Sequence, residues 1–248
     1  MPELKITGII PCFNHEKWIN QAIDSMMNQT RPPDLIVVVD DGSTDKSFEK
    51  VLERIYKPKN DKEKIEGKIL HTNQRIILTK LGQNYGPSIS RNVAMKFTWN
   101  ETDLFAFLDS DDLYENTKIE KSMNQFDEGT GAVYSDFTTW NEETGLKIKQ
   151  FKPAFTRNLL LQECIVNNDS LVAKKALEIC GLYWEVIRSC EDYDLWLRIS
   201  EKFIIKHIPE QLVTIRIGNH SQSTQQSKQR WEENYRKVFQ RMQARATQ

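Results

Sequence analysis

The chain has 248 residues, of which 39% are hydrophobic and 28% charged, and its formal net charge is −1. These values exclude a collagen-like, low-complexity or intrinsically disordered chain, and the length suits one large domain. A charge so close to zero gives no reason to expect nucleic acid as a partner. No apolar run approaches the roughly 20 residues of a membrane span, and the first residues do not resemble a signal peptide.

Strand and helix patterns alternate over the first 112 residues. Short apolar runs predict strands at 6–11, 35–39, 75–79 and 104–108, and helical spacing predicts helices at 18–27, 48–55 and 88–97. Asn14 is the candidate N-cap of the first helix, and the Lys- and Glu-rich segment 57–68 indicates an exposed loop. This alternation predicts a mainly parallel sheet covered by helices, with ligands beyond the carboxyl ends of the strands.

The pattern is looser in the second half of the chain. It predicts helices at 117–127 and 192–202 and strands at 132–134, 203–208 and 212–217. The segment 133–172 fits no simple pattern. Residues 226–248 are basic and predict a terminal helix with Trp231, Tyr235, Val238 and Met242 on one side. This helix either packs on its own domain or docks on an anionic membrane surface or a partner.

Four cysteines (Cys12, Cys164, Cys180 and Cys190) form no CxxC pair and show no zinc spacing. A disulfide framework would be denser and is typical of shorter chains. We therefore expect reduced thiols in a cytoplasmic protein.

Two acidic clusters follow predicted strands. Asp109-Ser110-Asp111-Asp112 places three carboxylates within four residues, which would repel one another unless a cation such as Mg²⁺ or Mn²⁺ lay among them. The alternative is a turn with helix-capping aspartates. Asp40-Asp41-Gly42-Ser43-Thr44-Asp45 is ordinary turn chemistry, although a carboxylate here could also accept hydrogen bonds from a base or ribose. The absence of GxGxxG disfavours a dinucleotide site.

Two further segments carry candidate polar groups. Glu191-Asp192-Tyr193-Asp194 opens a predicted helix, and the helix dipole alone would account for acidic residues in a first turn. His220 lies in a polar loop, where a lone histidine is usually only solvated.

These motifs, taken in order, resemble glycosyltransferase family 2. The first blocks are Ile9-Ile10-Pro11-Cys12-Phe13-Asn14, Val37-Val38-Val39 with Asp40 to Asp45, Asn84-Tyr85-Gly86-Pro87-Ser88, Ser90-Arg91-Asn92, and Phe107-Leu108 with Asp109 to Asp112. The later blocks are Gly181-Leu182-Tyr183, Glu191 to Arg198, and Val213-Thr214-Ile215-Arg216 with His220 and Ser223. The resemblance covers residues 5–225, and the ordered set is far more specific than any single block.

The resemblance implies an α/β GT-A fold, with a Rossmann-like, mainly parallel mixed sheet flanked by helices. It implies a single domain at 1–225, with a nucleotide-sugar half at 1–112 and an acceptor half at 113–225, followed by the basic helix at 226–248. The family has Thr or Ser more often where this chain has Cys12, and the 58–68 loop is longer than the family pattern.

The family's site residues can be carried over position by position. Pro11, Cys12, Phe13, Asn14 and Asp41 would line the base and ribose pocket, and Arg91 would lie near the nucleotide. Asp109 and Asp111 match the Asp-x-Asp motif for ribose and metal–diphosphate contact, with Ser110 between them. Asp192 matches the catalytic base, and His220 matches a further metal contact of some members.

The resemblance also implies an activity. The chain would transfer a sugar from a nucleoside diphosphate sugar to a saccharide or lipid-linked acceptor, with inversion and with Mn²⁺ or Mg²⁺, in polysaccharide biosynthesis. It would be cytoplasmic, with the C-terminal segment as a candidate peripheral contact at the inner face of the membrane. Two rivals stay open: a sugar-phosphate nucleotidyltransferase, which usually has a Gly-rich basic phosphate loop, and a catalytically silent binding or scaffolding domain.

Overall fold

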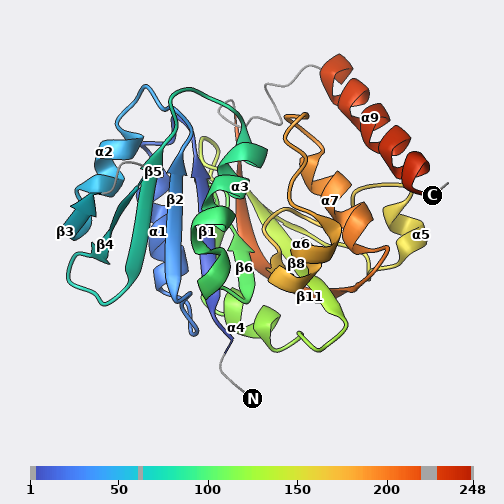
Figure 1. Cartoon of the computed structure of the whole chain (residues 1–248), viewed down its shortest axis with the longest axis horizontal. Helices are drawn as coiled ribbons and strands as arrows, with labels where there is room; N and C mark the ends of the chain where they lie inside the picture. The colour runs from blue at the N-terminus through green and yellow to red at the C-terminus, as the bar shows by residue number, and fades with distance from the viewer. Residues whose placement is uncertain (1–3, 61–63, 219–227, 247–248) are drawn as a thin grey trace.

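The computed structural model describes residues 4–60, 64–218 and 228–246, and within them the strands form one 11-stranded sheet (Figure 1). The strand order is β3-β4-β5-β2-β1-β6-β10-β8-β11-β7, with β9 paired to β8. The predicted mixed α/β architecture is confirmed.

Four neighbouring strands in the first half of the sheet are parallel, and all are buried except at the two ends of the outermost one. They are β1 (Ile6–Cys12), β2 (Leu35–Asp40), β5 (Arg75–Lys80) and β6 (Leu104–Phe107). The register pairs Cys12 with Asp40 and Asp40 with Lys80, so these strands end at one edge. This edge therefore receives the loops that follow β1, β2 and β6.

Helices cover both faces of the sheet, because strand side chains alternate between the faces. Ile10 and Val38 pack with α1 (Ile19–Met27), α2 (Ser47–Leu52) and α4 (Lys118–Met123). Ile9 and Val37 belong to the core on the other face. That core also includes residues of α3 (Pro87–Thr98), α5 (Arg157–Leu160), α6 (Lys174–Cys180), α7 (Glu191–Ile199) and α9 (Lys228–Ala246).

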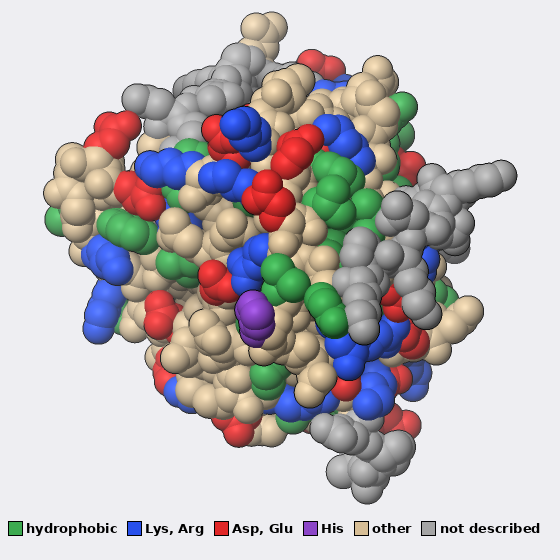
Figure 2. All heavy atoms as spheres, turned by 90° about the vertical axis from the view of Figure 1, so that its left-hand side faces the viewer, with side chains coloured by type: hydrophobic (Ala, Val, Ile, Leu, Met, Phe, Trp, Pro, Cys, Tyr) green, Lys and Arg blue, Asp and Glu red, His purple; other side chains and the backbone are tan. Residues whose placement is uncertain are grey.

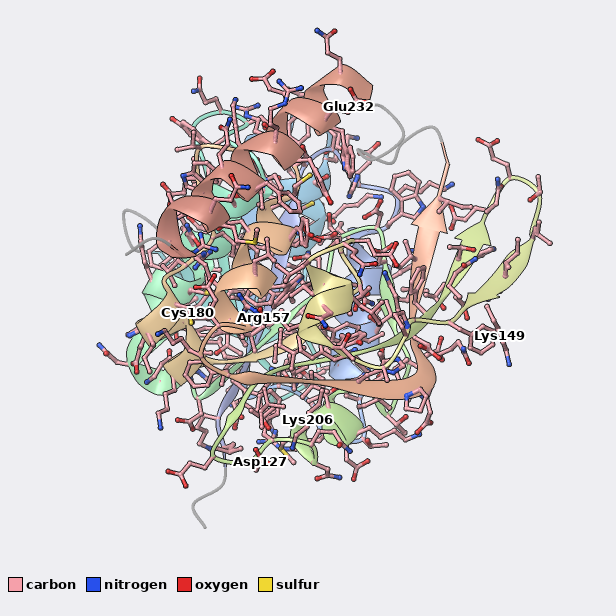
Figure 3. All side chains as sticks on the ribbon, turned by 90° about the vertical axis from the view of Figure 1, so that its right-hand side faces the viewer. Asp127, Lys149, Arg157, Cys180, Lys206 and Glu232 are labelled. Carbon is pink, nitrogen blue, oxygen red and sulfur yellow. The ribbon has the colours of Figure 1, made fainter. Side chains whose placement is uncertain are left out.

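The second half of the sheet is mixed: β8 and β11 form a long parallel pair, and the other pairings are antiparallel. It adds β7 (Leu113–Tyr114), β8 (Thr130–Asn141), β9 (Lys147–Gln150), β10 (Leu171–Ala173) and β11 (Ile204–Ile217). β10 runs antiparallel to both β6 and β8 and joins the two halves. The β8–β9 hairpin projects from the body of the molecule, with Lys149 on its outer strand (Figure 3).

The predicted loop at 57–68 is wrong. The structure has an antiparallel hairpin there, β3 (Ile55–Asn60) and β4 (Ile65–Ile69), and β4 pairs with β5. Charged side chains are common on edge strands, where they discourage pairing with other chains. Figure 2 shows this side of the molecule, with basic and acidic side chains interspersed over the surface.

Two smaller predictions also need correction. The strands expected at 203–208 and 212–217 are one strand, β11, with register shifts around Gln211. Asn14 does not cap the first helix, because α1 begins at Ile19 and has no side-chain cap. The backbone of Asn14 is left-handed, with φ at 56°.

The C-terminal helix packs on its own domain. Val238 of α9 is fully buried, and Tyr235, Phe239 and Met242 pack against the core that includes α7. Trp231, at the start of α9, stays 47% exposed. Within the described part of the chain, no helix combines the length and the apolar character that crossing a membrane requires.

Candidate active site at the carboxyl edge of the sheet

The loops after β1 and β2 are joined by hydrogen bonds through short polar side chains. The backbone N–H of Asn14 donates to Ser43 Oγ at 2.9 Å, and the side-chain oxygen of Asn14 accepts from the backbone N–H of Thr44 at 2.8 Å. The backbone N–H of His15 donates to Ser47 Oγ at 2.9 Å. Asn14 thus connects two loops, which explains why it does not cap a helix.

Asp41 shapes a third loop of the same edge. Its two carboxylate oxygens accept from the backbone N–H groups of Tyr85 at 2.9 Å and Gly86 at 2.8 Å. Burial raises the pKa of Asp41, and these two N–H groups partly offset the effect. Gly42 must be glycine, since φ is 74° and a Cβ would lie 2.6 Å from the backbone carbon of Gln83. In the structure Asp41 therefore holds the loop at Tyr85 and Gly86, and its contact with a base or ribose stays a prediction.

Pro11 and Cys12 lie within the sheet at the end of β1. Pro11 is buried and pairs with Val39, and the Cys12 side chain belongs to the core that contains α1. Burial raises the pKa of the Cys12 thiol to about 12, so the thiol stays protonated. Phe13 is partly exposed and Asn14 is exposed, so these two residues are the ones in the loop after β1 that a ligand can reach.

The Asp109–Asp112 segment follows β6 after one residue, Leu108, and brings three carboxylates close together. The side chain of Asp109 is 41% exposed, whereas Asp111 is 13% exposed and lies 3.8 Å from His15 Nδ1. Ser110 is buried, with its Oγ 2.7 Å from the same ring nitrogen. Burial above all, and then the charges of Asp111 and Asp109, raise the pKa of Asp112 well above its usual value.

Arg216 of β11 fastens this acidic segment to the rest of the fold. Its backbone N–H donates to Asp112 Oδ1 at 2.8 Å, and its guanidinium donates to the carbonyl oxygen of Asp111. The guanidinium also donates to Glu142 Oε1 at 2.9 Å and lies 5.0 Å from the ring centre of Trp140. Arg216 belongs to a recognised sequence block, but the sequence did not predict its role.

Arg91 of α3 connects the acidic segment to α7. Its side chain is 3% exposed and donates to Asp109 Oδ1 at 2.7 Å and to Glu191 Oε1 at 2.8 Å. Burial alone would lower the pKa of Arg91, but the neighbouring negative charges, that of Asp109 foremost, together outweigh burial and raise it. The contact of Arg91 with Glu191 was not predicted, because 100 residues separate the two positions.

Asp192 stands next to this ion pair, in the first turn of α7. Burial above all, and then the adjacent charge of Glu191, raise its pKa to about 7. The backbone N–H of Tyr193 donates to Asp192 Oδ1 at 2.8 Å, and the charges of Arg91 and Asp109 both act on this carboxylate. The helix dipole favours a charged carboxylate in a first helical turn, but burial and the charge of Glu191 act in the opposite direction and raise the pKa of Asp192.

The residues at this edge fit a divalent cation that is shared with a bound diphosphate. Within residues 4–60, 64–218 and 228–246, no three His, Cys, Asp or Glu side chains are arranged to hold a metal ion by themselves. Mg²⁺ sites in phosphate-binding enzymes commonly use one or two carboxylates together with substrate phosphates. Asp109 and Asp111 supply two such carboxylates, and their crowding with Asp112 favours a cation. The predicted ligand His220 lies outside the described residues.

Known proteins share sequence and fold with this chain. The family model described as Glycosyl transferase family 2 matches residues 7–174. An uncharacterised glycosyltransferase of Rickettsia bellii is 30% identical over 220 residues, which are 87% of this chain and 29% of that protein. A chondroitin synthase of Pasteurella multocida is 27% identical over 203 residues, 80% of this chain and 19% of that protein. The chain thus spans less than a third of the length of these two relatives.

Solved structures show the same fold. S. aureus TarS 1–349 in complex with UDP-GlcNAc superposes with a TM-score of 0.72 at 20% identity, covering 95% of this chain and 65% of that chain. The mannosyltransferase PcManGT from Pyrobaculum calidifontis, in complex with GDP-Man and Mn²⁺, gives a TM-score of 0.64 at 17% identity, covering 90% and 60%. The fold is therefore that of the GT-A glycosyltransferases. The chain belongs to glycosyltransferase family 2.

Proposed function

We propose that this chain is an inverting glycosyltransferase that moves a sugar from a nucleoside diphosphate sugar to an acceptor hydroxyl. The observation that carries the proposal is the position of Asp192, a carboxylate of pKa about 7 next to the Arg91–Glu191 pair. The nucleotide sugars bound to TarS and PcManGT support the donor class. Relatives named chondroitin synthase and hyaluronan synthase support a saccharide acceptor and a role in polysaccharide biosynthesis.

In the proposed reaction Asp192 is the general base. It takes the proton of the acceptor hydroxyl while the acceptor oxygen bonds to the anomeric carbon and the bond from that carbon to the diphosphate breaks. A base works best when its pKa lies near the working pH, and a pKa of about 7 meets that condition. Glu191 is paired with Arg91, and Asp194 is fully buried, so neither neighbour competes for the role.

On the donor side, Phe13 and Asn14 would contact the base and ribose, with Asp41 holding the neighbouring loop. Asp109 and Asp111 would hold Mn²⁺ or Mg²⁺, which would offset the charge of the departing diphosphate. Arg91 would keep Asp109 in place, because their contact at 2.7 Å is almost completely buried on the arginine side.

A panel of nucleoside diphosphate sugars tests the proposal. Purified protein is incubated with each donor, a set of saccharide acceptors and Mn²⁺, and release of nucleoside diphosphate is measured. We expect metal-dependent release with one donor, and a product whose anomeric configuration, read by NMR, is opposite to that of the donor.

The Asp192→Asn variant tests the assignment of the base. We expect kcat to fall by about 10²-fold or more, the contribution typical of general acid–base catalysis, while donor binding stays near that of the wild type. A product with retained configuration would contradict the single displacement. Normal turnover in Asp192→Asn, with turnover abolished in Glu191→Gln, would move the base to the neighbouring residue.

A further inference from the structure

We propose that the C-terminal helix α9 is a positioning element of the active site, with Asn234 and Arg241 holding the loop and the helix that present Asp192. This inference rests on the proposed function of Asp192 as the base. α9 runs alongside α7 in both ribbon views (Figures 1 and 3). Its role would be to fix where the base points when an acceptor binds.

The loop before α7 is anchored on its inner side by α3. The side chain of Asn92 accepts from the backbone N–H of Tyr183 at 3.1 Å and donates to the carbonyl oxygen of Tyr183 at 2.9 Å. Arg198 of α7 donates to the carbonyl oxygens of Gly181 at 2.7 Å and Leu182 at 2.8 Å. These bonds fix the beginning of the loop, at 181–183, but not its end.

At the end of the loop, Arg188 donates to the carbonyl oxygen of Asn84 at 3.1 Å, and the next residue, Ser189, is held by α9. Asn234 is buried and its Nδ2 donates to Ser189 Oγ at 2.7 Å. Ser189 stands three positions before Asp192 and directly before Cys190, whose backbone is left-handed, with φ at 60°. A left-handed residue other than glycine is conformationally costly and persists only where its surroundings hold it. The bond from Asn234 is one such restraint, placed next to the helix start that carries the base.

α9 also holds the body of α7 through a buried carboxylate. Asp194 is fully buried, and its Oδ2 accepts from Arg198 Nε at 2.9 Å and from Arg241 Nη1 at 2.7 Å. The Arg241 guanidinium lies 4.6 Å from the ring centre of Trp184, on the loop before α7. Arg241 therefore contacts both the loop before α7 and α7 itself.

Aromatic packing also fixes the position of α7 relative to α9. Tyr193, the residue after Asp192, is stacked on Tyr235 of α9 with ring centres 5.5 Å apart and planes at 26°. Because Asp192 and Tyr193 are consecutive in one helical turn, a shift of Tyr193 also moves the carboxylate of Asp192. Arg91 and α9 therefore both restrain α7.

The variants Asn234→Ala, Ser189→Ala and the double variant test the proposal. We expect each single change to lower kcat by roughly 10-fold, since small displacements of catalytic groups are costly in rate. Donor affinity, measured by calorimetry with the nucleoside diphosphate and Mn²⁺, should stay within about twofold of the wild type, because the contacts of Asn14, Asp109 and Asp111 are untouched. The double variant should lose no more than the worse single variant, since both remove the same hydrogen bond.

Arg241→Ala provides a second route, with Arg241→Lys as the conservative variant that keeps the charge near Asp194 and recovers part of kcat. Lys237→Ala is the matched control, since Lys237 also lies on α9 and its Nζ pairs with Glu233 of the same helix at 2.7 Å. All variants are compared at a temperature where circular dichroism shows them folded. If Arg241→Ala does not fold, the Asn234→Ala and Ser189→Ala variants alone test whether α9 positions the base.

Each outcome has a separate meaning. A wild type without turnover on any donor, or a fully active Asp192→Asn, refutes the proposed function rather than the role of α9. If Asp192→Asn is inactive but the Asn234 and Ser189 variants keep wild-type kcat, α9 does not position the base. An equal loss of kcat and donor affinity in these variants would indicate general destabilisation and would also overturn the proposal.

Discussion

The loops on the donor side of the site (residues 13–15, 41–47 and 82–86) are held by hydrogen bonds between backbone and short polar side chains. The acceptor side, from Gly181 to Arg198, has such hydrogen bonds as well, but it is also held by buried arginine–carboxylate pairs. Asn14, for example, meets Ser43 and Thr44 across adjacent strand ends. Asp194 meets Arg198 and Arg241, the second of which comes from the C-terminal helix.

The difference matters because the two kinds of contact fail in different ways. Loss of one neutral hydrogen bond costs about 1 kcal/mol, although a buried group left without any partner costs more. Removal of one partner from a buried ion pair leaves an uncompensated charge and costs about 3–5 kcal/mol. We therefore expect the acceptor side to tolerate substitution poorly, and the donor side to respond mainly through ligand binding.

The largest effect is expected from Asp194→Asn. The change keeps the shape of the side chain but leaves Arg198, which is buried, without its carboxylate. We expect the free energy of unfolding to fall by about 3–5 kcal/mol, measured by urea denaturation. The control is Asp24→Asn, where the carboxylate is 51% exposed and pairs with Arg54; exposed pairs contribute about 1 kcal/mol or less. If both changes lowered the free energy of unfolding equally, the buried ion pairs of the acceptor side would not be more sensitive to substitution than exposed pairs.

A smaller effect, on binding rather than stability, is expected from Asp111→Asn. Asp111 lies on a loop at the open edge, and the change removes one of the two proposed metal ligands. We expect affinity for a nucleoside diphosphate in Mn²⁺ to fall at least tenfold, since even residues that only orient ligands contribute roughly 10-fold to metal affinity. Thermal stability should change little. Undiminished wild-type binding and turnover in excess chelator would exclude the metal from the account.

The smallest effect is a pH-dependent difference in stability between the wild type and Asp192→Asn. Folding raises the pKa of Asp192 to about 7, so its protonated form favours the fold below pH about 4, and this contribution is lost as pH rises through about 7. Asn does not titrate. Urea denaturation should therefore show the wild type losing stability relative to the variant between about pH 4 and about pH 7. A constant difference would mean that the folded state does not shift this pKa.

The donor side could be predicted from the sequence to a large extent, because its parts are local. Asp41 follows a buried strand directly and Asp109 follows one after a single residue, and parallel strands bring such positions to one edge. The errors arose where the partners lie elsewhere in the chain. Asn14 is of a residue type that is common at N-caps. Its side-chain oxygen instead accepts a hydrogen bond from the backbone N–H of Thr44 in another loop. The many charged residues of segment 57–68 are typical of a loop. The segment nevertheless contains β4, which is paired with β5 along the sheet edge.

The acceptor side was much less predictable, since its contacts span long stretches of sequence. The strand β10 is three residues long and pairs with both β6 and β8, so no local pattern marks it. Arg91 and Glu191 were both in recognised blocks, but nothing in either block indicates that the two side chains meet. The packing of α9 on α7 follows from Tyr193 and Asp194 facing partners that lie more than 40 residues further along the chain.

The central claim, that Asp192 is the base and that burial and Glu191 tune it, is tested most directly by the pH dependence of kcat. The base must be unprotonated, so kcat of the wild type should rise with pH and level off above a midpoint of about 7. The residual activity of Asp192→Asn should lack this step. A wild-type profile with its midpoint near pH 4, or the same step near pH 7 in Asp192→Asn, would contradict the account.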